Sequence, residues 1–264
     1  MRAEHLEIAI SVRKLTCAYG GHLVLREVSF DVRRGEIFVI IGGSGCGKTT
    51  LLKHMIGLYH PVSGSINYHL QGLGESRDMA QAQSPEKEEI LRHLGVMYQG
   101  GALFGSMTLL ENVQLPLEEF TNLPPEAREF IARMKLSLVG LERFGSYMPA
   151  ELSGGMQKRA AIARAMALDP EVLFLDEPSA GLDPSTSAGL DELIRNLSES
   201  LGVTFVPVSH ELPSIFAISD TVILLDESAK GIVAQGDPGE LRNVSGNPLV
   251  RRFFHREASK AEVT

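Results

Sequence analysis

Residues 36–50 of the chain are EIFVIIGGSGCGKTT, and this stretch decides the fold. The apolar run from Ile37 to Ile41 predicts a buried strand, and the residues Gly42 to Thr49 match the pattern G-x-x-x-x-G-K-[ST]. The sequence KTTLLKHMIGLYH then predicts a helix that ends before Pro61. A strand, a glycine loop and a helix in this order are typical of α/β proteins with a mostly parallel sheet.

The glycine loop predicts a phosphate site, because its backbone N–H groups can turn inward around phosphate oxygens. In this pattern Lys48 reaches the β and γ phosphates, and the hydroxyl of Thr49 binds Mg²⁺. A lone match could be an ordinary glycine turn, but the strand before it and the helix after it favour a nucleotide site. Cys46 is interpreted as a small filler rather than a redox switch. We expect a nucleotide and Mg²⁺ as ligands, with the nucleotide bound by Gly42, Gly43, Ser44, Gly45, Cys46, Gly47, Lys48, Thr49 and Thr50.

Length and composition fit one large domain, or a core with a smaller lobe. The chain has 264 residues, of which 44% are hydrophobic. A formal net charge of −8 argues against a nucleic-acid partner, since affinity for the phosphate backbone needs clustered Lys and Arg. The N-terminal sequence lacks the apolar core of a signal peptide, and the longest apolar runs are of strand length. We expect a protein that is soluble by itself, with Cys17 and Cys46 as reduced thiols.

Further strands and an inserted helical lobe are expected along the chain. Two alternating segments on either side of Gly20-Gly21 predict antiparallel strands. Helices are expected after Ser84-Pro85, after Pro124-Pro125 and after Ser153, and together they predict the lobe. The second of these helices carries apolar residues at helical spacing, namely Phe130, Ile131, Met134 and Leu138.

The α/β core resumes at residues 171–178, EVLFLDEP, and continues through the strand VTFVPVSH and the strand TVILLD. Pro207 lacks an N–H group, so it predicts an edge strand or a bulge. The last polar residues of the tail are expected to be loosely ordered. We expect one domain over residues 1–264, divided into a core of about 1–98 and 168–245, a helical subdomain of about 99–167 and a tail of 246–264.

Four residues outside the loop are candidates for chemistry on the nucleotide. In P-loop NTPases an acidic residue at a strand end holds Mg²⁺, which predicts this role for Asp176. The adjacent Glu177 would polarise the attacking water; such a pair is common by itself and becomes informative beside the loop. His210 could reach the γ phosphate, although a lone histidine at a strand end is most often an ordinary residue. Gln99 could contact Mg²⁺ or the water.

Two more segments bear on nucleotide binding. Tyr19 precedes Gly20-Gly21, where its ring could stack on adenine or be an ordinary half-buried strand aromatic, and both interpretations stay open. Residues 151–159 are ELSGGMQKR, in which Ser153 is a good N-cap and small residues let an anion approach the start of a helix. The sequence therefore predicts a second phosphate site, far from the first.

Together these motifs resemble the nucleotide-binding subunit of an ATP-binding cassette (ABC) transporter over nearly the whole chain. The order is that of the family: aromatic residue, Walker A loop, Q-loop glutamine, LSGGQ-like signature, Walker B strand, D-loop and H-loop histidine. Met156 stands where the signature usually has Gln. The matching positions are Tyr19, Gly42 to Thr49, Gln99, Leu152 to Met156, Asp176-Glu177, Asp183 and His210.

The resemblance implies a P-loop ATPase fold of ABC type that works as a homodimer. Two subunits would pack head to tail, so that each ATP lies between the Walker A loop of one and the signature of the other. The signature residues Ser153, Gly154 and Gly155, together with Asp183, would then bind the partner's nucleotide. It also implies that Glu177, His210 and Gln99 are catalytic and that Thr49, Gln99 and Asp176 hold the metal.

The segment after Gln99, GGALFGSMTLLENVQLPL, narrows the resemblance. It is similar to the ATPases of MCE-protein lipid transporters such as the Mla phospholipid system. This similarity implies permease subunits of the Mla type, a periplasmic MCE protein and a place on the cytoplasmic face of the inner membrane. Two alternatives remain: the ATPase of an importer for a small polar solute, and a soluble ABC protein outside transport.

Overall fold

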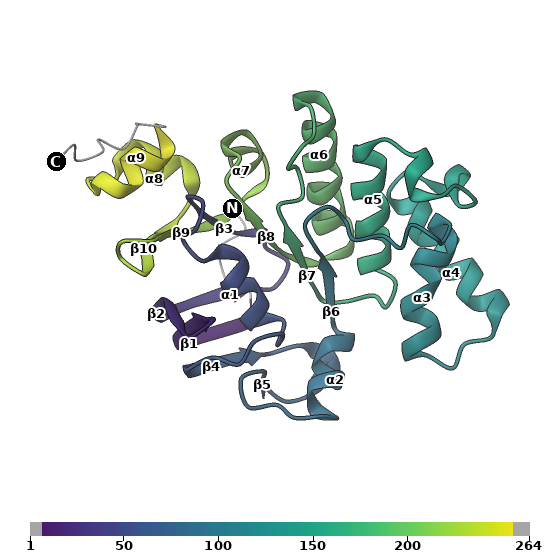
Figure 1. Cartoon of the computed structure of the whole chain (residues 1–264), viewed down its shortest axis with the longest axis horizontal. Coiled ribbons are helices and arrows are strands. Elements are labelled where there is room, and N and C mark those ends of the chain that lie inside the picture. The colour runs from purple at the N-terminus through teal and green to yellow at the C-terminus, as the bar shows by residue number, and fades with distance from the viewer. Residues whose placement is uncertain (1–6, 256–264) are drawn as a thin grey trace.

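Two β-sheets form the framework of the computed structural model, which describes residues 7–255 except the side chain of Val244. The larger sheet has the strand order β10-β9-β3-β8-β7-β6 and is parallel except for β10 (Figure 1). This confirms the mostly parallel core. Its strands are β3 (Phe38–Gly42), β6 (Leu94–Met97), β7 (Val172–Asp176), β8 (Thr204–Ser209), β9 (Thr221–Asp226) and β10 (Gly231–Gly236).

The smaller sheet is antiparallel, as the N-terminal segments predicted. It has the order β2-β1-β4-β5. Gly20 and Gly21 form the turn between its first two strands, and the register pairs Tyr19 with His22 across that turn. Tyr19 therefore lies at the tip of a hairpin. The strands are β1 (Ile8–Tyr19), β2 (His22–Arg33), β4 (Ser63–Tyr68) and β5 (Arg77–Asp78), and the short helix η1 (Gln71–Leu73) joins the last two.

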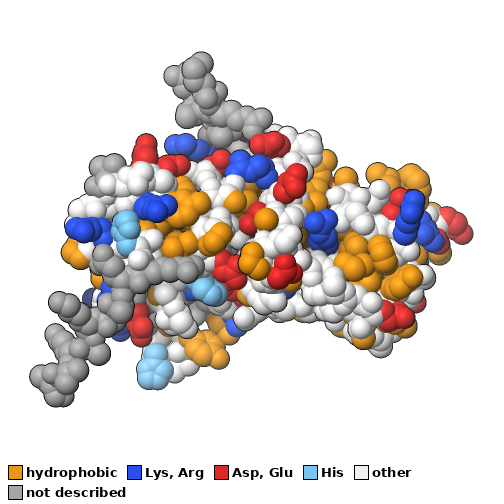
Figure 2. Space-filling model, turned by 90° about the horizontal axis from the view of Figure 1, so that it is seen from above, with side chains coloured by type: hydrophobic (Ala, Val, Ile, Leu, Met, Phe, Trp, Pro, Cys, Tyr) orange, Lys and Arg blue, Asp and Glu red, His pale blue; other side chains and the backbone are white. Residues whose placement is uncertain are grey.

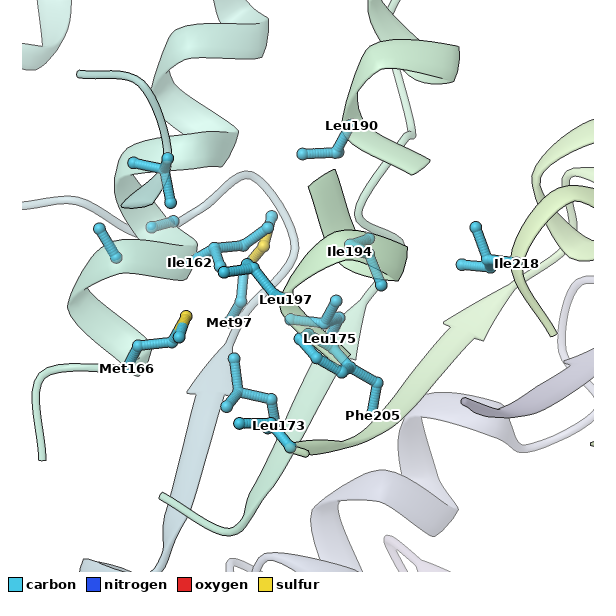
Figure 3. Packing of buried hydrophobic residues seen from close by; sticks show 14 of the residues in the cluster. Met97, Ile162, Met166, Leu173, Leu175, Leu190, Ile194, Leu197, Phe205 and Ile218 are labelled. Carbon is cyan, nitrogen blue, oxygen red and sulfur yellow. The ribbon is translucent and has the colours of Figure 1, made fainter. Parts of the chain in front are cut away.

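Both faces of the larger sheet are buried, which explains why its strands are continuous apolar runs in the sequence. Along β7, Leu173 and Leu175 belong to one hydrophobic cluster, and Val172 and Phe174 to the other. Figure 3 shows the first cluster, where side chains of β6, β7 and β8 lie beneath three helices. These helices are α5 (Gly154–Ala165), α6 (Pro184–Leu201) and α7 (Leu212–Ile218).

The opposite face is covered by α1 (Lys48–Met55), by α2 (Glu86–Arg92) and by the smaller sheet. The helix after Ser84-Pro85 was expected in the lobe, but Ile90 of α2 is buried in the same cluster as Leu51 of α1. The helices between β6 and β7 extend to one side of the core instead (Figure 1). They are α3 (Leu109–Phe120), α4 (Pro125–Leu138), η2 (Glu142–Phe144), η3 (Pro149–Glu151) and α5.

Helix α4 confirms the helical spacing of its apolar residues but exposes most of them. Phe130, Met134 and Leu138 are 65%, 50% and 40% exposed, whereas Ile131 packs against the core. We call these three residues the α4 stripe. Figure 2 shows hydrophobic side chains gathered on the end of the molecule that carries the lobe. Spacing identified the helix correctly, but it did not reveal which face the helix buries.

Pro207 lies in a central strand, so the prediction of an edge strand is wrong. β8 runs between β3 and β7, and its register with β7 continues through Pro207, which pairs with Leu175. On the other side, the N–H of Phe205 donates to the C=O of Glu36 at 3.0 Å, and pairing with β3 resumes only at Val208. The missing N–H therefore opens a local gap in the ladder between β8 and β3.

The last two helices of the described residues pack near β10; they are α8 (Pro238–Val244) and α9 (Pro248–Phe254). Phe254 is buried in the first cluster, 5.7 Å from the ring of Phe216, centroid to centroid. The expectation of loose order falls on residues beyond position 255, outside the described chain. Among residues 7–255, none of the helices has the length and apolarity needed to cross a membrane.

Candidate nucleotide-binding site

The glycine loop joins β3 to α1 and leaves the start of that helix open to an anion. Gly47 is the N-cap of α1, and neither a side-chain cap nor an acidic residue occupies the first turn. Its φ is +103°, and a Cβ there would lie 2.7 Å from Cγ1 of Val24. Only glycine fits this position without strain. The first N–H groups of α1 remain available to phosphate oxygens.

Lys48 places its ammonium group inside the loop. Its Nζ donates to the backbone oxygens of Gly42 and Gly43, each at 3.0 Å, and the side chain is buried. The nearest carboxylate, that of Glu177, lies 4.0 Å from Nζ, so this buried cation is available to a closer anionic partner. The lysine is thus positioned for the phosphate contact that the sequence pattern predicts.

Walker A and Walker B meet through a hydrogen bond. The hydroxyl of Thr49 donates to Oδ1 of Asp176 at 3.2 Å. Burial raises the pKa of Asp176, although the bond from Thr49 acts in the opposite direction. A buried carboxylate beside a hydroxyl oxygen is the kind of hard-oxygen pair that Mg²⁺ prefers. These two residues fit a metal site.

Most of the predicted catalytic and phosphate-binding residues line one cavity of about 250 Å³. It joins three distant segments of the chain, so the structure brings Gln99 and Glu177 to the phosphate loop. The side chain of Cys46 is buried and does not line this cavity. Burial raises the pKa of its thiol, which agrees with its interpretation as a filler. The cavity is lined by Ser44, Gly45, Gly47, Lys48, Thr49, Thr50, Gln99 and Glu177.

Glu177 is held by its backbone and by one carboxylate oxygen. Its Oε1 lies 2.8 Å from Nδ1 of His210 and 4.0 Å from Nζ of Lys48. The backbone has φ of +49°, and its N–H donates to the C=O of Val208 at 2.9 Å. Oε2 is buried and has no hydrogen-bond partner among the described residues. A buried oxygen without a partner calls for a donor that the described residues do not supply, and a water molecule is such a donor.

The signature segment caps helix α5 outside this cavity. Ser153 is exposed, and its Oγ accepts the N–H of Met156 at 3.3 Å. Gln157 donates to the C=O of Pro149 and of Leu152, so it supports the turn that precedes the helix. Ser153 does not line the cavity around Lys48. Within one chain, the two phosphate sites are separate.

Gly155 is required by the packing of α5 against α6. A Cβ on Gly155 would lie 2.3 Å from Cγ2 of Thr186, whereas one on Gly154 would make an ordinary contact of 3.6 Å with Leu182. We expect Gly155→Ala to lower the free energy of unfolding by about 1–3 kcal/mol through overpacking. Chemical denaturation measures the loss.

The matched controls for Gly155→Ala come from the same contact. Gly154→Ala should leave stability nearly unchanged, and adding Thr186→Ser should restore the Gly155→Ala protein by removing Cγ2. If the double variant is as unstable as Gly155→Ala alone, the clash with Thr186 is not the cause.

Tyr19 and Asp183 lie outside the cavity lining as well. Tyr19 is 60% exposed, and its ring centroid is 5.6 Å from that of Tyr59. Asp183 is the N-cap of α6, where its Oδ1 accepts the N–H groups of Ser185 and Thr186. The hydroxyl of Thr186 also donates to this carboxylate, and these bonds lower the pKa of Asp183. Asp183 therefore has a structural role in the single chain.

Two residues that organise the segment after Gln99 escaped the sequence analysis. Asn112 is fully buried in α3; its Oδ1 accepts the N–H of Phe104, and its Nδ2 donates to the C=O of Phe104, Met107 and Thr108. Arg164 of α5 donates to the C=O of Gly101 and Ala102. Asn112 lies in α3, a helix that was not predicted from the sequence, so its position on a buried face could not be recognised.

Asn112→Leu should destabilise the lobe because the N–H of Phe104 and the C=O of Met107 lose their hydrogen-bond partner. We expect the free energy of unfolding to fall by roughly 2–4 kcal/mol, as measured by chemical denaturation. Asn122→Leu, at an exposed position, is the control and should change little. Equal stability of the two variants would contradict the role of Asn112.

Comparison with known proteins agrees with this geometry. The ABC transporter family model matches residues 25–180, and the chain belongs to that family and is an ATP-binding ATPase. Over 245 residues it is 38% identical to the intermembrane phospholipid transport system ATP-binding protein MlaF of Escherichia coli strain K12, covering 93% of this chain and 88% of the relative.

A second relative and a solved structure extend the comparison. The chain is 38% identical over 248 residues to the probable ribonucleotide transport ATP-binding protein mkl of Mycobacterium leprae, covering 94% of this chain and 69% of the relative. A dimeric ATP-binding cassette in a post-hydrolysis state, bound to ADP and Pi, matches with a TM-score of 0.75 and 29% identity. That match covers 86% of this chain and 98% of the solved chain.

Proposed function

We propose that the chain is the ATPase subunit of a transporter that moves phospholipids between the inner and outer membranes. The similarity to MlaF over 93% of the chain is the observation that carries the proposal. Residues 101–104, GALF, also support it, since this segment is similar to that of the ATPases of MCE-protein lipid transporters. Asn112 and Arg164 hold the segment close to Gln99, which lines the nucleotide cavity.

The working unit is a homodimer in which two chains share each ATP. The separation of Ser153 from the cavity around Lys48 supports this arrangement, since neither site alone encloses a γ phosphate. The solved relative is a dimer bound to ADP and Pi. In our proposal Ser153, Gly154 and Gly155 complete the partner's site, with Asp183 beside them, and Tyr19 stacks on adenine.

Hydrolysis is assigned to Glu177 and His210. Oε2 of Glu177 accepts a proton from the attacking water, and His210 holds Oε1 and faces the γ phosphate. Lys48 and the N–H groups at the start of α1 stabilise the charge that develops on the phosphate. Thr49, Asp176 and Gln99 would hold Mg²⁺, which when bound supplies positive charge to the phosphate oxygens.

The subunit works at the cytoplasmic face of the inner membrane, bound to permease subunits of the Mla type and, through them, to a periplasmic MCE protein. The loop between β6 and α3 exposes Tyr98 and Phe104, which are 36% and 50% exposed. Tyr98 directly precedes Gln99 and Phe104 follows it closely in the chain, so these side chains suit a permease contact that responds to the nucleotide.

Affinity purification from membranes tests the proposal. The tagged chain should recover a permease and an MCE protein, and its loss should disturb the lipid composition of the outer membrane. Recovery of a solute-importer permease without an MCE protein would contradict it.

Transport of a polar solute such as a ribonucleotide is the second candidate, because the relative mkl is named a probable ribonucleotide transport ATP-binding protein. Uptake that depends on the chain while lipid distribution stays normal would favour this candidate. Purely cytosolic fractionation with no permease partner would favour a role outside transport.

A further inference from the structure

Lys158 of helix α5 is a buried lysine that contacts the backbone of Glu177. Only 6% of the residue is exposed, and its Nζ donates to the C=O of Glu177 at 3.3 Å. Lys158 lies within residues 151–159, but no motif there gives it a role. Sequence spacing could not reveal it, because the contact joins residues 19 positions apart on separate elements.

An ammonium group at this depth requires compensation for lost hydration. Burial lowers the pKa of Lys158, while the nearby carboxylates of Asp176, Glu177 and Glu211 act in the opposite direction. The hydrogen bond nevertheless goes to a peptide oxygen rather than to a carboxylate. The lysine therefore acts on the backbone of the Walker B turn and adds positive charge behind its two acids.

The backbone that Lys158 holds is an unusual one. Glu177 has φ of +49°, a left-handed conformation that a residue with a side chain seldom adopts without support. Its N–H is held by Val208 and its side chain by His210. Its C=O accepts two bonds of 3.3 Å, one from the N–H of Ala180 and one from Nζ of Lys158, and the second ties it to α5. Contacts from β8, from the residue that follows it and from α5 thus determine where the carboxylate of Glu177 points.

Helix α5 has Ser153 as its N-cap and Lys158 about one and a half turns further on, roughly 7.5 Å along the helix axis. A shift of this helix when Ser153 contacts the partner's ATP would move Nζ of Lys158, which donates to the C=O of Glu177. We propose that Lys158 is a positioning residue that couples closure on the partner's ATP to the alignment of this chain's own Glu177. This inference rests on the proposed homodimer and on the assignment of Glu177.

Lys158→Met tests the inference, since methionine has similar length but no donor. We expect the full-length ATPase, alone and with its membrane subunits, to bind ATP normally and to hydrolyse it roughly 10- to 100-fold more slowly. The Hill coefficient for ATP should fall toward that of independent sites. Lys158→Gln keeps a neutral donor and should retain far more of both the rate and the cooperativity.

Lys135→Met is the matched control, because Lys135 is also a buried lysine of the lobe but pairs with Asp169, away from the nucleotide cavity. It should lower stability and leave the Hill coefficient unchanged. The inference is overturned if Lys158→Met keeps the wild-type rate and cooperativity, or if Lys158→Gln is as impaired as Lys158→Met. Glu177→Gln separates the two levels: if that variant keeps the wild-type rate, the assignment of Glu177 on which this inference rests fails, whereas the role in transport is tested separately by the proteins recovered from membranes.

Discussion

Glu177→Gln is expected to slow ATP hydrolysis by roughly 10²- to 10⁴-fold while ATP binding stays intact. The amide cannot accept a proton from the attacking water, but it keeps the size of the side chain and a hydrogen bond to His210. The contacts that Lys48 and the start of α1 offer to phosphate are unchanged. ATP should therefore bind without turnover.

Such a protein should accumulate as a dimer with trapped ATP, because hydrolysis is the step that opens the interface. Size-exclusion chromatography with and without ATP measures the dimer, and phosphate release measures the rate. Glu192→Gln, on the exposed surface of α6, is the control and should behave as wild type. A wild-type rate in Glu177→Gln would remove Glu177 from the mechanism.

Ser153→Arg is expected to abolish ATP-driven dimer formation and to slow hydrolysis by roughly 100-fold or more. Ser153 is exposed at the start of α5, so the chain should tolerate the larger side chain. At a closed interface, however, the arginine would occupy the space of the partner's γ phosphate. Each isolated chain should still bind ATP at Lys48, as measured with a fluorescent nucleotide.

Two controls distinguish the shared site from a folding defect. Ser153→Ala removes only the cap and should cost about 1 kcal/mol of stability. Mixing Ser153→Arg chains with Lys48→Ala chains should restore up to about a quarter of the activity, because half of the dimers then contain one intact composite site. No recovery in the mixture, or normal cooperative hydrolysis by Ser153→Arg alone, would contradict the two-chain model.

Local sequence patterns predicted the fold and the cavity because each of its residues sits at the end of a strand or in the glycine loop. The carboxyl ends of parallel strands meet at one edge of a sheet, so Asp176, Glu177 and His210 had to approach the loop after β3. Their convergence follows from topology, and topology follows from the order of strands and helices.

Contacts between distant helices could not be predicted in this way. Lys158 and Arg164 act through backbone oxygens on distant parts of the chain, and a backbone oxygen carries no sequence signal. Pro207 was misplaced for a related reason: a proline can lie in a central strand when one ladder bond is absent. Both cases depend on which elements become neighbours, and no single segment encodes that.

The α4 stripe has a consequence for the life of the protein in the cell. Phe130, Met134 and Leu138 display on a folded chain the same apolar cue that chaperones and proteases recognise on an unfolded one. We expect chains whose α4 stripe is not covered by a binding partner to be recognised by chaperones and proteases. The abundance of the ATPase would then be set after translation, by the number of partner molecules that can cover the stripe.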